Sequence, residues 1–112
     1  MTNWKYLREL ILERCQGYCE MCGLPLPESF ALHHRLLRSR GGKDTVDNLL
    51  ALHHGCHNGN TNAVHFNVAW SEERGYIVPT RQIPSEYPVT LANGSTVKPV
   101  SYTHLRAHET RE

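Results

Sequence analysis

The sequence predicts a small α+β domain held together by a metal ion, and three observations support this prediction. Two pairs of potential metal ligands share an x-x spacing, Cys19-x-x-Cys22 and His53-x-x-Cys56. They enclose two short apolar runs typical of strands, and a helical pattern precedes them. The chain has 112 residues, enough for one domain with a modest hydrophobic core. A metal ion would therefore add stability where the core alone is small.

The first element expected is a helix over residues 3–14. Trp4, Leu7 and Ile11 recur there at three- and four-residue steps. Asn3 is a suitable N-cap, and Gly17 a suitable stop signal.

The remaining elements follow from apolar runs and turn residues. Residues 30–37 and 48–52 are expected to form strands, separated by a glycine-containing loop. A helix is expected over residues 56–70, although several asparagines and a glycine are poor helix formers. Residues 76–78 are a further candidate strand. Residues 89–97 contain Asn-Gly between alternating apolar positions, which predicts a β-hairpin.

This pattern divides the chain into three parts. Residues 1–70 hold the potential ligands, and residues 71–99 form a small β extension. Residues 100–112 resemble translated adapter sequence, so we interpret them as non-native and leave His104 and His108 out of the site. No secretory signal or membrane-spanning run is visible. We therefore expect a cytoplasmic protein, in the host cytoplasm if it is phage-encoded.

The two spaced pairs predict a structural zinc site. Zinc prefers four tetrahedral ligands and accepts both sulfur and imidazole. The expected ligands are Cys19, Cys22, His53 and Cys56. His54 competes with His53 for the imidazole position. Cys15 fits neither pair and is expected to be a packed free thiol.

The central segment resembles a known nuclease family. His33-His34, Asn48 and His57 have the order and spacing of the HNH endonucleases, also called ββα-metal nucleases. The resemblance covers residues 4–65 and is similar in detail to small HNH proteins of actinobacterial phages. It implies a ββα-metal domain with a zinc-knuckle staple, an N-terminal helix and a C-terminal β-hairpin.

The resemblance also implies roles for individual residues. His34 matches the general base, and His33 and His57 match ligands of a catalytic ion. Asn48 matches the residue that tethers the active-site loop and orients the base through its backbone carbonyl. The implied reaction is hydrolysis of a DNA phosphodiester bond by activated water, leaving a 5′-phosphate and a 3′-hydroxyl. Mg²⁺ is the default ion, but two imidazoles favour softer ions such as Mn²⁺, Ni²⁺, Co²⁺ or Zn²⁺.

A basic cluster near these residues predicts contacts with DNA. Formal net charge is only +1, so any attraction for DNA must be local. The expected DNA-binding residues are Arg35, Arg38, Arg40 and Lys43. Arg35 directly follows the proposed base, so we also expect it to hold the scissile phosphate. His65 is expected to lie too far from His57 to share its ion, and to be a helix-surface residue or a phosphate contact.

Several roles are compatible with this pattern. A DNA nuclease could act in phage packaging beside a terminase, or in restriction. The main alternative is a non-catalytic zinc-binding module that binds DNA or a protein. Such a module has no use for His34 or His57, which favours the enzyme. A degenerate, inactive nuclease is a third possibility, because His53 stands where cysteine is usual.

Overall fold

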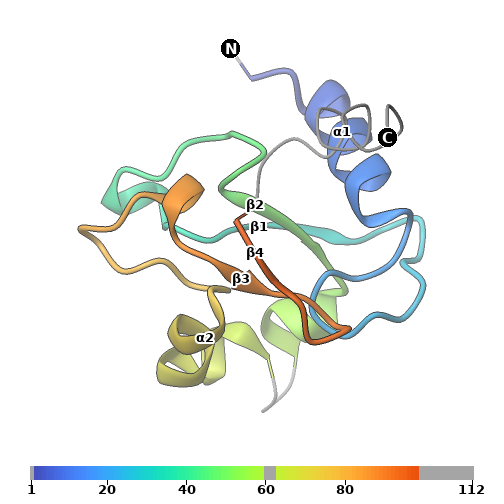
Figure 1. Ribbon diagram of the computed structural model, residues 1–112. Coiled ribbons are helices and arrows are strands. Elements are labelled where there is room, and N and C mark those ends of the chain that lie inside the picture. Colours follow the sequence, from blue (N-terminus) through green and yellow to red (C-terminus); the bar gives the residue numbers. More distant parts are fainter. Residues whose placement is uncertain (1, 60–62, 99–112) are drawn as a thin grey trace, which may run out of the picture.

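The computed structural model describes residues 2–59 and 63–98 and has the expected α+β architecture (Figure 1). The helices and strands are α1 (Trp4–Cys15), β1 (Ala31–His34), β2 (Leu49–Leu52), α2 (Val68–Arg74), β3 (Val89–Thr90) and β4 (Thr96–Val97). Shorter helical turns are η1 (Arg38–Arg40), η2 (Gly55–Gly59), η3 (Val64–Phe66) and η4 (Pro84–Glu86). Among the helices of these described residues, none is long and apolar enough to cross a membrane.

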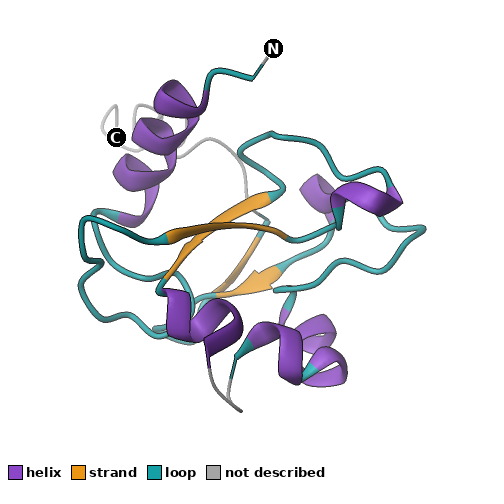
Figure 2. Ribbon diagram, turned by 180° about the vertical axis from the view of Figure 1, so that it is seen from behind, coloured by secondary structure: helices purple, strands orange, loops and turns teal. Residues whose placement is uncertain are grey.

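An antiparallel ribbon of β1 and β2 forms the centre of the fold (Figure 2). All four residues of β2 are buried. Leu49 and Ala51 pack in one hydrophobic cluster with Ile11 of α1, whereas Leu50 and Leu52 pack in a second cluster. The partners in that second cluster are Cys19, Val64, Tyr76 and Val89. The ribbon therefore lies between α1 and the C-terminal elements, because side chains alternate along a strand.

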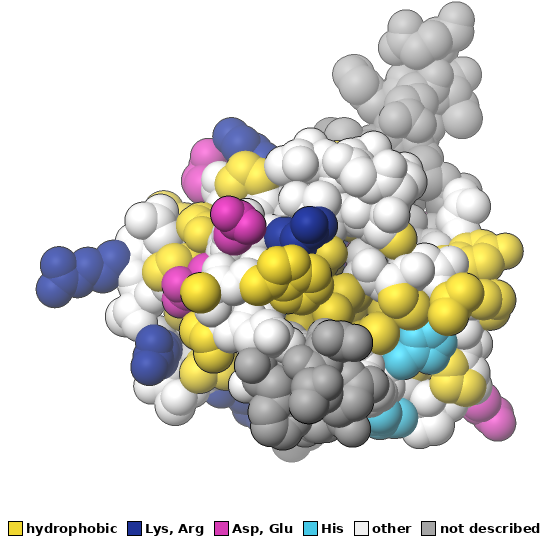
Figure 3. All heavy atoms as spheres, turned by 90° about the horizontal axis from the view of Figure 1, so that it is seen from below, with side chains coloured by type: hydrophobic (Ala, Val, Ile, Leu, Met, Phe, Trp, Pro, Cys, Tyr) yellow, Lys and Arg dark blue, Asp and Glu magenta, His cyan; other side chains and the backbone are white. Residues whose placement is uncertain are grey.

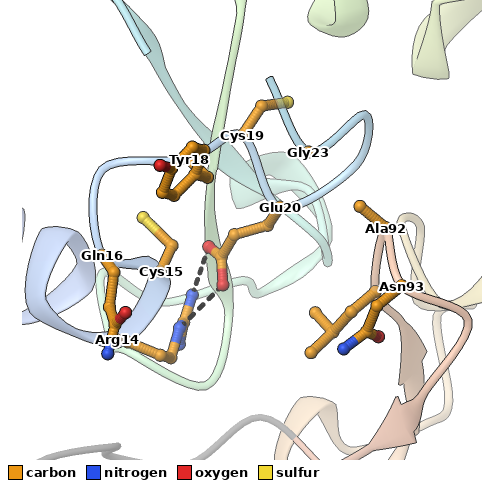
Figure 4. A pocket seen from close by; sticks show the side chains of 10 residues that line it. Arg14, Cys15, Gln16, Tyr18, Cys19, Glu20, Gly23, Ala92 and Asn93 are labelled. Atoms are coloured by element: carbon orange, nitrogen blue, oxygen red, sulfur yellow. Dashed lines mark hydrogen bonds and ion pairs between the residues drawn. The ribbon is translucent and has the colours of Figure 1, made fainter. Parts of the chain in front are cut away.

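The N-terminal helix begins and ends close to the predicted positions. The side chain of Asn3 accepts a hydrogen bond of 3.1 Å from the backbone N–H of Tyr6, which caps the first turn. Near the C-terminus of α1, the buried guanidinium of Arg14 binds both carboxylate oxygens of Glu20, at 2.9 Å and 2.7 Å (Figure 4). Glu20 also accepts from the N–H of Ala51. This network ties α1 and the first cysteine pair to β2.

The single helix expected over residues 56–70 is wrong. The chain instead forms η2, a wide turn, and then η3, and it resumes as α2 only at Val68. The asparagines and glycine that weakened the prediction fall in this interrupted stretch, and residues 60–62 lie outside the described part of the chain.

The strand predictions have mixed outcomes. The strand at 48–52 and the hairpin at 89–97 are confirmed. The strand expected over 30–37 covers only Ala31–His34. Residues 76–78 form no strand: Val78 donates its N–H to the carbonyl of Arg35, and Tyr76 donates to Ser71. The bond from Val78 attaches this segment to the end of β1, and the bond from Tyr76 attaches it to α2.

The segment that follows residue 70 shares the core with the segment before it. The expected boundary between residues 70 and 71 falls inside α2. Tyr76 and Val89 pack in the same cluster as Leu50. The phenol of Tyr76 also donates to the carbonyl of Thr90 at 2.7 Å. The tail that we interpret as non-native, residues 100–112, lies outside the described residues.

Candidate metal centres and active site

Three cysteines and one histidine converge at the turn after α1. Donor atoms of Cys19, Cys22, His53 and Cys56 all lie within 4.8 Å of one another. The first pair lies on a tight turn in which the N–H of Cys22 points at the sulfur of Cys19, at 3.4 Å. Gly23 ends this turn with a φ of +80°, a conformation that favours glycine. The four side chains form a set suited to one tetrahedral metal ion.

The histidine of this cluster is His53. Its Nδ1 lies 3.2 Å from the sulfur of Cys22, and its Nε2 lies 2.8 Å from the carbonyl oxygen of Pro25. A carbonyl can only accept, so Nε2 carries the proton and Nδ1 keeps its lone pair for a metal. His54 instead pairs with the hydroxyl of Ser29. The thiol of Cys15 lies 3.8 Å from the carbonyl oxygen of Leu12 and outside the cluster.

Burial and hydrogen bonding shift the pKa values of the three thiols in different directions. Burial acts to raise the pKa of Cys19, but hydrogen bonds from backbone N–H groups, first that of Cys22, lower it below the ordinary value. Burial raises the pKa of Cys22, and raises that of Cys56 to about 12, where the neighbouring Cys19 adds to the effect. Thiols that still carry a proton must lose it to bind a cation, so the affinity of this cluster for metal depends on pH.

A second cluster consists of three histidines. Donor nitrogens of His33, His57 and His65 lie within 4.8 Å of one another, and the Nε2 atoms of His57 and His65 are 3.0 Å apart. His33 comes from β1, His57 from η2 and His65 from η3. Two nitrogens bound to one ion at about 2.1 Å, with bonds at right angles, would be about 3 Å apart. The spacing therefore fits a shared divalent ion.

His33 is oriented by the segment after α2. Its Nε2 lies 2.6 Å from the carbonyl oxygen of Tyr76, so Nδ1 is left as the nitrogen with a free lone pair. The side chain is buried, and burial lowers the pKa of His33 to about 3. Burial also lowers the pKa of His57, with a further contribution from His65. These imidazoles are therefore neutral near pH 7, which is the form that binds metal.

His34 points to the opposite side of β1 from His33, toward α1. Its ring centroid lies 6.1 Å from that of Trp4, in an edge-to-face arrangement. Its Nε2 lies 2.7 Å from Oδ1 of Asp44, and Oδ2 of Asp44 accepts from the hydroxyl of Thr2 at 2.7 Å. The bonds from Thr2 and then His34 lower the pKa of Asp44, so this group is a carboxylate. Asp44 is not among the site residues predicted from the sequence.

An open cavity joins the two sides of β1. Its volume is about 250 Å³, and it opens where β1 ends at His34. The lining residues include His33, His34, Arg38, His57 and His65. The β1–β2 pairing runs in continuous register, so no bulge turns His33 and His34 to the same face of β1. The two side chains reach one site because β1 ends at His34, where both of them line the same opening. On the face shown in Figure 3, histidine side chains reach the surface.

Residues 19–63 match the family model described as HNH endonuclease. This segment is similar to HNH endonucleases, and we call residues 19–63 the HNH domain. No curated protein and no solved structure gives a significant match to the chain. The matched residues include both cysteine-containing pairs, both strands of the central ribbon and the turn that carries His57. The match supports a nuclease-family function in general terms and implies a nucleic acid substrate.

Asn48 of the HNH domain holds the loop between β1 and β2. Its side-chain oxygen accepts from the N–H of Leu36 at 2.7 Å, and its amide donates to the carbonyls of Leu36 and Lys43. Its backbone carbonyl accepts from the N–H of Arg35. The expectation that this carbonyl orients the base is therefore wrong: in the described part of the chain, the ring of His34 pairs with Asp44.

The expectation that Arg35 holds the scissile phosphate or binds DNA is wrong. Arg35 is 0% exposed, and burial lowers its pKa to about 10, so the guanidinium still carries its charge. Each of its three guanidinium nitrogens donates to a backbone carbonyl within the protein, in four hydrogen bonds in all. The accepting backbone carbonyls belong to Asp47, Gly75, Pro84 and Tyr87. Arg35 therefore attaches the C-terminal segment to the HNH domain.

The other basic residues occupy different positions. Arg38 lines the histidine cavity, its side chain is mostly exposed, and its Nε lies 3.8 Å from Oδ1 of Asp44. Arg40 is exposed and donates to the hydroxyl of Thr80. Lys43 lines a separate cavity between the loop and residues 83–84. Of the four, Arg38 is the one placed at the histidine cluster.

The expectation that His65 lies too far away to share an ion with His57 is also wrong. It assumed a continuous helix after residue 56, on which eight residues would separate the two rings by two turns. Because the helix is interrupted, η3 folds back and brings the ring centroids to 4.7 Å.

Proposed function

We propose that the HNH domain is a metal-dependent endonuclease that hydrolyses DNA phosphodiester bonds and leaves a 5′-phosphate and a 3′-hydroxyl. One observation carries the proposal. His34, paired with a carboxylate, opens into the same cavity as three histidines whose spacing fits a divalent ion. A base and a cation site close together are what hydrolysis of a phosphodiester requires.

His34 is proposed as the general base. Its Nε2 is occupied by Asp44, which leaves Nδ1 to accept a proton from the attacking water. The carboxylate fixes the tautomer and stabilises the imidazolium that forms, as the acidic residue does in other base–carboxylate pairs. Thr2 holds the second carboxylate oxygen and restricts Asp44 to this orientation.

The three-histidine cluster is proposed to hold the catalytic ion. When bound, a divalent ion supplies a Lewis acid that stabilises the charge developing on the phosphate and the leaving oxygen. Three imidazoles leave coordination positions open for phosphate oxygens and water. This nitrogen-rich set favours Mn²⁺, Co²⁺, Ni²⁺ or Zn²⁺ over Mg²⁺, which prefers oxygen ligands. The additional ligand His65 strengthens this preference beyond what His33 and His57 alone implied.

The cysteine-rich cluster is proposed to hold a structural Zn²⁺ ion. Four protein ligands complete a tetrahedron and leave no position for a substrate. Cys56 and His57 are adjacent in η2, so this ion would also hold the backbone that carries one ligand of the catalytic ion.

DNA is proposed to enter along the exposed side of the cavity, where Arg38 would contact a phosphate. Arg40, two residues further on in η1, is a second proposed contact outside the cavity. Lys43 would contact DNA only beyond the cavity, since it lines a different hollow. Roles in packaging beside a terminase, or in restriction, stay predictions.

Incubation of supercoiled plasmid with the purified protein and Mn²⁺ or Mg²⁺ tests the proposal. The parent protein should produce nicked or linear DNA with ends that ligase can reseal, because ligase requires a 5′-phosphate. His34→Ala should lower the rate at least about a hundredfold. His54→Ala is the matched control and should cleave like the parent. If His34→Ala is as active as the parent, the assignment of the base is wrong.

A further inference from the structure

An exposed tryptophan lies beside the proposed base. Trp4 is 39% exposed and belongs to neither hydrophobic cluster of the described residues. Its ring centroid lies 6.1 Å from that of His34, with an interplanar angle of 79°. A single exposed aromatic ring is common on protein surfaces, so the inference rests on the place of Trp4 beside His34 and not on its exposure alone.

The position of Trp4 is well defined by its neighbours. Asn3 caps α1 and sets the helical backbone from Trp4 onward. Thr2 is hydrogen-bonded to Asp44, the residue that pairs with His34. The chain on the N-terminal side of Trp4 is therefore attached to the proposed catalytic pair. An indole held in one place loses little entropy when it binds a flat partner.

A positive charge also lies close to His34 and Asp44. Arg38, on the loop after β1, also approaches Asp44 and lines the cavity. A phosphate drawn toward Arg38 and the histidine cluster would leave its neighbouring nucleotide near α1. Nucleic acid sites that combine a basic groove with an aromatic ring bind bases by stacking, which requires an accessible base face.

We propose that Trp4 stacks on the base of the nucleotide next to the scissile phosphate, so that the preferred substrate is DNA whose bases are unpaired at the cut. This inference rests on the proposed nuclease function and adds the substrate class to it. In duplex DNA, the base faces are covered by stacked neighbours. Cleavage of single-stranded or locally melted DNA would therefore be favoured over cleavage of regular duplex.

Kinetics on a single-stranded oligonucleotide and on its duplex give the first test. Trp4→Leu should raise KM for the single strand about tenfold with little change in kcat, since stacking contributes about 1–3 kcal/mol per base. Trp4→Phe keeps a flat ring and should stay within about threefold of the parent. Trp70 is 38% exposed, and its ring contacts Tyr76 and Arg74, whereas that of Trp4 contacts His34, so Trp70→Phe is the matched control. An unchanged KM in Trp4→Leu, or an equal loss for the duplex, would overturn the proposal.

Fluorescence gives a second test that does not depend on cleavage. The chain has two tryptophans, so Trp70→Phe leaves Trp4 as the sole indole. A short oligothymidylate should quench its emission, whereas an abasic strand with the same phosphates should not. Equal quenching by both strands, or none, would contradict stacking. Quenching by the base-bearing strand, without cleavage of either plasmid or single-stranded DNA, would reject the nuclease function but retain the base-binding site.

Discussion

His34 and Asp44 are joined by a contact of 2.7 Å between Nε2 and Oδ1, across the loop that connects the two central strands. Asp44 lies ten residues after His34 in a loop that Asn48 closes with three hydrogen bonds. The proposed base is thus oriented by a carboxylate whose position depends on the fold of the loop.

Replacement of Asp44 by asparagine tests this relationship. Asn can still accept a hydrogen bond through its side-chain oxygen, but it lacks the charge that stabilises a protonated imidazole. We expect Asp44→Asn to lower the rate of plasmid cleavage about tenfold or more, with little effect on folding. Asp47 lies in the same loop and bonds to Thr45, so Asp47→Asn is the control. Equal rates for the parent and Asp44→Asn would leave His34 without a partner in the mechanism.

Replacement of Arg35 should affect stability. Arg35→Met would leave four buried or partly buried carbonyls without their donor, and each such loss costs about 1–3 kcal/mol. We expect the free energy of unfolding in urea to fall by at least about 3 kcal/mol. Arg40→Met, at an exposed position, should change it by less than about 0.5 kcal/mol. A small effect of Arg35→Met, together with weaker DNA binding, would restore the original phosphate assignment.

Replacing one cysteine at a time tests which thiols hold the structural metal ion. Cys19→Ser should abolish stoichiometric zinc and the cooperative thermal transition, because a structural zinc site contributes about 10 kcal/mol or more to folding. Cys15→Ser changes a thiol outside the cluster and should retain both properties. Zinc content by mass spectrometry and thermal unfolding by circular dichroism would show whether the two variants differ. If they behave alike, the cluster does not hold the metal.

Acid should destabilise the protein through His33. Its pKa in the folded chain is about 3, because of burial, and about 6.5 when unfolded. Between these pH values the unfolded chain binds a proton that the folded chain does not, so stability is retained above pH 6.5 and falls as the pH drops toward 3. The slope approaches about 1.4 kcal/mol per pH unit. Urea unfolding at pH 7 and pH 5, without added catalytic ion, should show a smaller pH dependence in His33→Asn than in His54→Asn. The same dependence in both variants would mean that His33 is not the titrating group.

Local signals in the sequence explain which elements were predictable. The cap at Asn3, the spacing of the cysteine-containing pairs and the Asn93-Gly94 turn each depend on residues close together in the chain. For these elements a short window contains the interactions that decide the structure.

The features that were missed depend on distant contacts. Arg35 is buried by backbone carbonyls up to 52 residues away, and a charged side chain in a loop ordinarily lies at the surface. Asp44 resembles any solvated loop carboxylate until the fold places it against His34. A continuous helix after residue 56 would place His65 two turns from His57, and that prediction fails because the helix is interrupted. The asparagines and glycine before His65 were the signal that could have prevented this error.

The dependence of plasmid cleavage on Mn²⁺ concentration shows whether the three histidines hold a catalytic ion. The parent protein and His54→Ala should cleave with the same saturable dependence on the ion. His57→Ala, which retains the four residues of the cysteine-rich cluster, should stay folded and show no cleavage at the concentration that saturates the parent. Cleavage by His57→Ala with the parent's ion dependence, or no ion-dependent cleavage by the parent, would contradict a catalytic ion at the three histidines.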